Sequence, residues 1–136
     1  FQFDDADAQI TRSLIAENFS VKADRAHLSS VFSNLLDNSI KYKQAGDLHL
    51  DIKTQNTLNQ LIIQITDNGI GMSNDDQKKI FTKFYRVPTG NVHNVKGFGL
   101  GLSYVKTILE AHHGGISVKS ELNKYTTFIV KLPITK

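Results

Sequence analysis

Apolar residues recur at helical spacing in two long segments of the chain. The repeating positions of residues 25–43, which would share one buried face, are Leu28, Val31, Phe32, Leu35 and Ser39. Asp24 directly precedes this segment and suits the N-cap position. The second segment, residues 100–112, ends before Gly114 and Gly115, a pair that favours a helix C-terminus. The pattern therefore predicts two amphipathic helices.

Other segments show the two-residue alternation of half-buried strands. The expected strands are residues 1–9, 19–23, 48–54, 60–66, 116–120 and 126–132. Polar turns join residues 48–54 to 60–66 and residues 116–120 to 126–132, as in antiparallel hairpins. Ser73 is expected to cap a short helix, whose first turn would contain Asp75 and Asp76.

The order of these elements indicates the fold class. Strands and helices are mixed, and antiparallel hairpins come late in the chain, which favours an α+β fold over a doubly wound parallel sheet. We expect a two-layer α/β sandwich, with a mixed, mostly antiparallel sheet packed on helices. The length of 136 residues suits one domain over residues 1–136, and 40% hydrophobic and 21% charged residues are ordinary for a globular protein.

Composition narrows the classes of function. The net charge is +3 and the Lys and Arg residues are scattered, so nucleic acid is not an expected partner. Cysteine is absent, which excludes disulfides and thiolate metal sites and is compatible with a reducing compartment. The longest apolar runs, such as residues 61–63, are too short for a bilayer, so this domain is not expected to enter a membrane. Phe1 is not an initiator methionine, and we expect a domain excised from a longer protein.

Asn34, Asn38 and Lys41 form the first of three candidate ligand-binding motifs. Their spacing of four and three places them on one stripe of the first helix, roughly 60° wide, beside its apolar face. Amide oxygens are hard ligands suited to magnesium, Lys41 can reach a phosphate, and Tyr42 can anchor the end of the helix. A solvated asparagine pair beside a capping lysine is the alternative, and the helix alone favours that alternative.

The second motif is Asp67-Asn68-Gly69-Ile70-Gly71-Met72. A carboxylate at the end of a strand can accept a hydrogen bond from an exocyclic amine, which adenine carries. Gly69 and Gly71 allow the backbone to approach a flat ligand closely. A common Asp-Asn-Gly turn is the alternative, although the second glycine makes it less favourable.

The third motif is Gly97-Phe98-Gly99-Leu100-Gly101-Leu102, directly before the second long helix. Closely spaced glycines at a helix N-terminus present backbone N–H groups and the positive end of the dipole to phosphate. The spacing is neither the dinucleotide fingerprint nor a Walker loop. Residues 87–96 precede it and are expected to form a mobile surface loop. The three motifs together predict a pocket for a magnesium nucleotide.

On these motifs the whole chain resembles the catalytic ATP-binding domain of a sensor histidine kinase of the GHKL superfamily. The resemblance implies an ATP lid over about residues 87–99 and a magnesium ion held by Asn38 with Asn34 assisting. It gives Asn34, Lys41 and Arg86 roles near the phosphates. The implied nucleotide-binding residues are Asn38, Tyr42, Asp67, Gly69, Gly71, Met72, Phe84, Lys96, Gly97, Gly99, Leu100, Gly101, Leu102 and Thr126.

The resemblance also implies partners. Members of the family transfer phosphate to a histidine on a separate dimerisation domain of the same protein, and then to the receiver domain of a response regulator. The five histidines lack the acidic neighbour and following proline of that acceptor, so we expect it outside this chain. The domain would then be the cytoplasmic portion of a sensor kinase, with or without a membrane anchor. In the late turn, Asn123 and Tyr125 replace glycines common in the family, and Asn123 is expected to tolerate positive φ.

Three functions remain open at this point. Related chaperones and topoisomerases hydrolyse ATP with a glutamate at the position of Asn34, four residues before the magnesium asparagine. A carboxamide cannot accept a proton from water at neutral pH, so the sequence favours a kinase over an ATPase. A catalytically silent module that binds ATP to control conformation is the remaining alternative.

Overall fold

The computed structural model describes residues 8–14, 24–44, 46–83, 85 and 101–134. Within these residues five strands form one sheet in the order β1-β2-β3-β5-β4. The strands are β1 (Ala8–Leu14), β2 (Leu48–Asn56), β3 (Gln60–Asp67), β4 (Gly115–Glu121) and β5 (Tyr125–Pro133). β1 pairs with β2 in parallel, whereas the β2–β3, β3–β5 and β4–β5 pairs are antiparallel. The sheet is therefore mixed and mostly antiparallel, as predicted.

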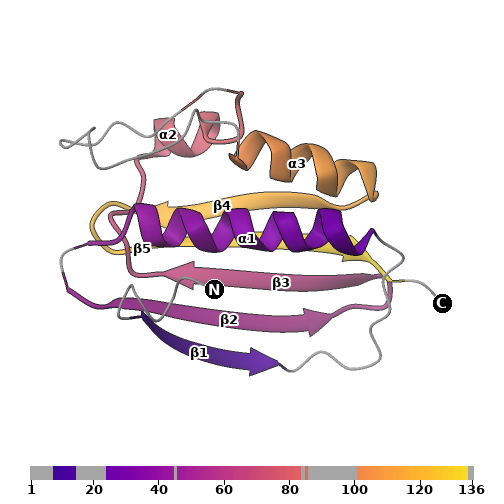
Figure 1. Cartoon of the computed structure of the whole chain (residues 1–136), viewed down its shortest axis with the longest axis horizontal. Helices are drawn as coiled ribbons and strands as arrows, with labels where there is room; N and C mark the ends of the chain where they lie inside the picture. Colours follow the sequence, from indigo (N-terminus) through magenta and orange to yellow (C-terminus); the bar gives the residue numbers. More distant parts are fainter. Residues whose placement is uncertain (1–7, 15–23, 45, 84, 86–100, 135–136) are drawn as a thin grey trace.

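Helices α1 and α3 lie over one face of this sheet, and α2 lies near one end of β4 (Figure 1). The helices are α1 (Arg25–Lys41), α2 (Asn74–Lys79) and α3 (Gly101–Ala111). The predicted caps are confirmed: the Asp24 carboxylate accepts from the His27 backbone N–H at 2.9 Å, and the Ser73 hydroxyl accepts from that of Asp76 at 3.2 Å. This arrangement confirms the predicted two-layer sandwich.

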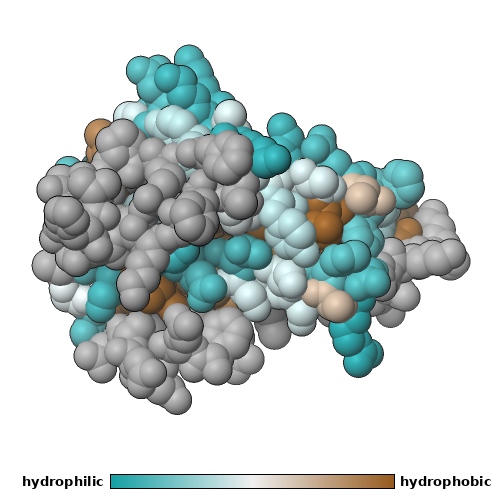
Figure 2. All heavy atoms as spheres, turned by 45° about the horizontal axis from the view of Figure 1, so that its top comes forward, coloured by the Kyte–Doolittle hydropathy of each residue, from teal (hydrophilic) through white to brown (hydrophobic). Residues whose placement is uncertain are grey.

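The core lies between the helices and the sheet. Val31 and Leu35 of α1 and Val105 and Leu109 of α3 are buried, and Phe128 of β5 lies among the buried residues of the sheet. Burying side chains of this size contributes about 1.5–3 kcal/mol each. On the face shown in Figure 2, the hydrophobic residues that are coloured lie in small separate patches among hydrophilic ones. None of the helices in the described ranges is long and apolar enough to cross a membrane.

Several predicted boundaries differ from the structure. Of the first strand, expected over residues 1–9, residues 1–7 lie outside the described residues; its end differs, because β1 extends to Leu14 in register with β2, where Ala8 is paired with Leu48. The first long helix ends at Lys41, because the non-helical Tyr42 forms its C-cap and donates its N–H to the Asn38 carbonyl. The strand expected over residues 19–23 and the loop over residues 87–96 lie outside the described residues.

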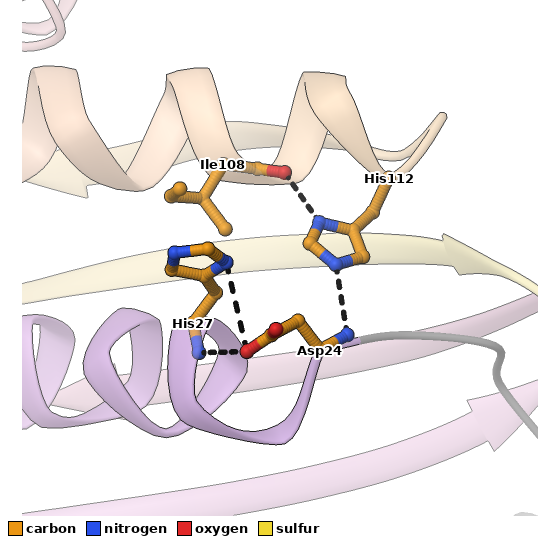
Figure 3. A network of polar contacts seen from close by, with 4 residues as sticks. All are labelled: Asp24, His27, Ile108 and His112. Carbon is orange, nitrogen blue, oxygen red and sulfur yellow. Dashed lines mark hydrogen bonds and ion pairs between the residues drawn. The ribbon is translucent and has the colours of Figure 1, made fainter.

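His112 joins the C-terminal end of α3 to the N-terminal end of α1 (Figure 3). Its Nε2 lies 3.1 Å from the Asp24 backbone nitrogen, and its Nδ1 lies 2.8 Å from the Ile108 carbonyl oxygen. A backbone N–H only donates and a carbonyl only accepts, so these partners require a neutral ring with its proton on Nδ1. The ring therefore helps to hold α3 against α1.

Candidate functional site

One pocket lies where α1, the end of β3, the β3–α2 loop and β5 meet. It encloses about 270 Å³ of space, including its open mouth. The residues that line it are Asn38, Tyr42, Asp67, Ile70, Gly71, Met72 and Thr126. Six of these seven were predicted as site residues, and Ile70 is the addition. The structure thus brings the first two motifs and the late threonine together from segments far apart in sequence.

Asp67 is the buried acid of this pocket. Its side chain is 5% exposed, and it accepts hydrogen bonds from the Ser39 hydroxyl at 2.9 Å and from the Gly69 backbone N–H at 2.8 Å. Burial raises the pKa of the Asp67 carboxyl, and the two hydrogen bonds act in the opposite direction. Thr126 lies directly opposite Asp67 in the β3–β5 register. An acceptor is thus held on the pocket wall, where a donor on a ligand can satisfy it.

The two glycines of the second motif are required for different reasons. Gly71 has φ +69°, and a Cβ there would lie 2.1 Å from the Glu121 carbonyl oxygen. A Cβ on Gly69 would lie 2.6 Å from the Tyr42 carbonyl oxygen and 2.8 Å from Asp67 Oδ1. The backbone N–H of Ile70 donates to that same Tyr42 carbonyl at 2.9 Å. Both glycines therefore allow the β3–α2 loop to pack against the end of α1 and the β4–β5 turn.

A polar network holds the part of the pocket wall formed by Met72 and Thr126. The Ser120 hydroxyl lies 2.8 Å from the Met72 backbone nitrogen, 2.7 Å from the Tyr125 carbonyl oxygen and 2.9 Å from Thr126 Oγ1. The Gln77 side chain donates to the Met72 and Ser120 carbonyls, each at 3.0 Å. In the turn between β4 and β5, Asn123 has φ 62°, which confirms the predicted positive φ.

The polar stripe of α1 forms the rim of the site. Asn34 Nδ2 donates to the Ser30 carbonyl at 2.8 Å, and its Oδ1 would lie 3.0 Å from a Cβ on Gly101, the first residue of α3. Because the amide nitrogen is bonded within the helix, the oxygen is the atom that faces the start of α3. Asn38 is half-buried and lines the pocket, whereas Lys41 is exposed and does not line it.

This rim fits a magnesium ion in its donor chemistry. The described residues contain no group of three or more His, Cys, Asp or Glu side chains that could hold a metal. The carboxamide oxygens of Asn34 and Asn38 are hard donors, and magnesium in nucleotide sites takes few protein ligands together with phosphates and water.

Other predicted site residues are placed differently. Leu102 is buried in the core, so only its backbone N–H in the first turn of α3 is suited to phosphate. The predicted residues that lie outside the described residues are Phe84, Arg86, Lys96, Gly97, Gly99 and Leu100.

Sequence reasoning also missed polar residues that support the site, among them Ser39, Gln44, Gln77 and Ser120. Ser39 was assigned only to the buried face of α1, although a hydroxyl in an apolar stripe is a signal of a buried polar partner. Gln44 donates to the Asn68 carbonyl at 3.2 Å and to the Gly69 carbonyl at 2.6 Å, and nothing in the local sequence indicates this contact.

Comparison with known proteins shows which family this chain is similar to. Residues 23–136 match the family described as histidine kinase-, DNA gyrase B-, and HSP90-like ATPase. The sensor protein RprX of Bacteroides fragilis is 51% identical over 129 residues, which are 94% of this chain and 25% of that protein. The signal transduction histidine-protein kinase ArlS of Staphylococcus aureus is 38% identical over 122 residues, which are 90% of this chain and 27% of that protein. The chain thus spans about a quarter of the length of these relatives.

Solved structures agree on the fold. The nucleotide-free catalytic domain of histidine kinase ThkA matches with a TM-score of 0.81 at 24% identity, over 99% of this chain and 86% of that one. The mycobacterial sensor histidine kinase MprB matches with a TM-score of 0.82 at 23% identity, over 98% of this chain and 88% of that one. At these identities the likeness concerns the fold.

Proposed function

Since the chain belongs to the histidine kinase-, DNA gyrase B-, and HSP90-like ATPase family, we propose that it binds Mg-ATP and donates the γ-phosphate to a histidine. That histidine lies on a separate dimerisation domain of the same protein, and the phosphate then passes to the receiver domain of a response regulator. The domain would act on the cytoplasmic side of its parent sensor. The buried Asp67 carboxylate opposite Thr126 is the single observation that carries the proposal.

Asp67 gives the pocket its preference for adenine. Its oxygens accept from Ser39 and Gly69, and it lines the pocket with further acceptor capacity. The exocyclic amine of adenine is a donor that matches this acceptor, whereas the keto oxygen of guanine or hypoxanthine would face it as a second acceptor. Leaving a buried polar group unpaired costs about 1–3 kcal/mol, which is enough to select between the bases.

The rim of α1 and the start of α3 are suited to the phosphates. Asn38 and the Oδ1 of Asn34 would hold a magnesium ion, and that ion, when bound, would offset the negative charge of the phosphates. Lys41 and Arg86 would contact phosphate oxygens. The N-terminal turn of α3 would add backbone N–H groups and the positive end of its dipole, and glycine at residues 97, 99 and 101 would leave no side chain in the way of a phosphate.

Asn34 favours phosphotransfer over hydrolysis. Its amide nitrogen is held by the Ser30 carbonyl, and a carboxamide does not accept a proton from water at neutral pH. The domain therefore positions the nucleotide and supplies no general base at this place. The nucleophile is supplied by the partner domain, so that catalysis depends on positioning and charge neutralisation.

Phosphotransfer is tested by mixing this chain with its native histidine-bearing domain and γ-labelled ATP. We expect Mg²⁺-dependent label on a histidine of that domain, and slow release of free phosphate when the chain is alone. ATP binding without transfer would instead support the silent ATP-binding module. Rapid phosphate release by the chain alone would support an ATPase, and Asn34→Glu provides a matched comparison for that activity.

A further inference from the structure

The Ser120 hydroxyl has two backbone neighbours with opposite hydrogen-bonding roles. The Met72 backbone nitrogen at 2.8 Å carries a hydrogen and can only donate, whereas the Tyr125 carbonyl oxygen at 2.7 Å can only accept. A serine hydroxyl has a single hydrogen. That hydrogen is therefore directed at Tyr125, and the lone pairs of Ser120 Oγ are left to accept.

This arrangement settles the direction of the next hydrogen bond. Thr126 Oγ1 lies 2.9 Å from Ser120 Oγ, and distance alone would allow either oxygen to donate. Because the Ser120 hydrogen is already used, the Thr126 hydroxyl must donate to Ser120. Thr126 is 5% exposed and lines the pocket, so toward a ligand it can only accept.

Ser120 itself is held in place from α2. Gln77 donates to the Ser120 carbonyl and to the Met72 carbonyl, each at 3.0 Å, and so ties together the two segments that meet at the Ser120 hydroxyl. The direction of the Thr126 hydroxyl thus depends on backbone groups and one amide, none of which is a titratable side chain.

We propose that Ser120 is a positioning residue for base recognition, which turns the Thr126 hydroxyl away from the ligand and makes Thr126 a second acceptor beside Asp67. The two residues are directly opposed across β3 and β5. A ligand edge that carries an amine then meets two acceptors, and a keto oxygen at the same place is rejected twice. This inference rests on the proposed nucleotide-binding function and identifies a residue that acts on selectivity through another residue.

The test is the ratio of the affinities for ATP and inosine triphosphate, measured by calorimetric titration of the 136-residue chain with magnesium present. In Ser120→Ala the freed Thr126 hydroxyl can turn and donate to the keto oxygen. One neutral hydrogen bond is worth about 1 kcal/mol, so the preference for ATP should fall by about 3- to 10-fold. In a Thr126→Val background, Ser120→Ala should leave the ratio unchanged, because the residue through which it acts is gone.

Thr66→Val is the matched control. Thr66 Oγ1 and Thr127 Oγ1 form a similar cross-strand hydroxyl pair at 2.8 Å, but neither residue lines the pocket, so the ratio should equal that of the wild type. Melting curves are recorded for each variant. If Ser120→Ala does not fold, Ser120→Cys retains the volume with a weak donor and should shift the ratio in the same direction.

Three results would overturn the proposal. They are an unchanged ratio in a folded Ser120 variant, an equal loss of affinity for both nucleotides, and the same Ser120→Ala shift with and without Thr126. If the wild-type chain binds neither nucleotide, the proposed function is overturned as well. This result is obtained before any variant is measured, so the two failures can be told apart.

Discussion

The base side and the phosphate side of the site are built in different ways. On the base side, Asp67 and Thr126 are 5% exposed and have hydrogen-bond partners on neighbouring segments, and Gly71 packs against the β4–β5 turn. On the phosphate side, Asn34 and Asn38 are half-buried on one helix and Lys41 is exposed. Base recognition is therefore preorganised in the fold, whereas phosphate recognition depends more on the ligand.

The strongest test of this comparison is one added methyl group on each side. Gly71→Ala combines positive φ with a Cβ 2.1 Å from the Glu121 carbonyl oxygen, and backbone must move to relieve the contact. We expect a loss of about 3 kcal/mol or more in the free energy of unfolding, from overpacking and left-handed strain together. Chemical denaturation of Gly71→Ala and the wild type measures this difference in unfolding free energy.

The matched variants are Gly115→Ala and Gly101→Ala. No atom lies within 4 Å of a Cβ on Gly115, so its effect on unfolding should be small. At Gly101 the Cβ lies 3.0 Å from Asn34 Oδ1, the end of a side chain that can shift, and alanine favours the helix by about 1 kcal/mol. A loss in Gly101→Ala equal to that in Gly71→Ala would refute the difference between the two sides.

Asp67→Asn should separate binding from folding on the base side. The amide can still accept from Gly69, and the Ser39 hydroxyl can turn to the Leu35 carbonyl, which lies 3.4 Å away. Without a charge to bury, stability should change by no more than about 1 kcal/mol. ATP affinity should fall about 10- to 100-fold, because a hydrogen bond to a charged group is worth about 1.5–3 kcal/mol. Unchanged affinity in a titration would refute the assignment of Asp67 to the base.

The pH dependence follows from the raised pKa of the Asp67 carboxyl, which burial causes. The carboxylate accepts from a donor amine more strongly than the protonated carboxyl does, so ATP affinity should fall as the pH is lowered through this raised pKa. For the free protein the sign is opposite. A pKa raised by folding contributes stability below the unfolded-state pKa, and this contribution is lost as the pH rises through the folded-state pKa.

Asp67→Asn is the reference for both pH measurements, because it removes this one titration and leaves that of the ligand in place. The difference in unfolding free energy, wild type minus Asp67→Asn, should become less favourable as the pH rises through the window above the ordinary aspartate pKa. A flat difference across that window would show that burial does not shift this carboxyl.

What could be predicted from the sequence depends on whether a residue acts through its neighbours in the chain or through distant segments. Asp24, Ser73 and Asn123 act through neighbours in the chain, and their caps and positive φ were predicted correctly. The reason for Gly71 and the role of Ser120 depend on contacts between β4, β5 and the β3–α2 loop, which no local pattern contains. The end of β1 likewise depends on its parallel pairing with β2. The sequence thus indicated which residue types form the candidate site, but it did not predict the partners that orient their side chains.

Asn38→Ala tests the phosphate side through its metal. We expect about a 10-fold loss of ATP affinity with magnesium present and little loss in its absence, because Asn38 would contribute one hard ligand of several. Titrations with magnesium and with a chelator measure the two values. An equal loss under both conditions, accompanied by a lower melting temperature, would indicate that Asn38 supports the fold instead.

Lys41→Ala should have the smallest effect, because its side chain is exposed on the last turn of α1. Surface substitutions usually change stability by no more than about 0.5 kcal/mol, and a solvent-screened charge contributes about 0.2–1 kcal/mol to an ionic contact. ATP affinity should therefore fall only about 2- to 5-fold, with a loss that shrinks as salt is added. Adenosine, which has no phosphate, should bind Lys41→Ala and the wild type equally well. A loss for adenosine as large as that for ATP would place Lys41 on the base side and contradict the division between the two halves of the site.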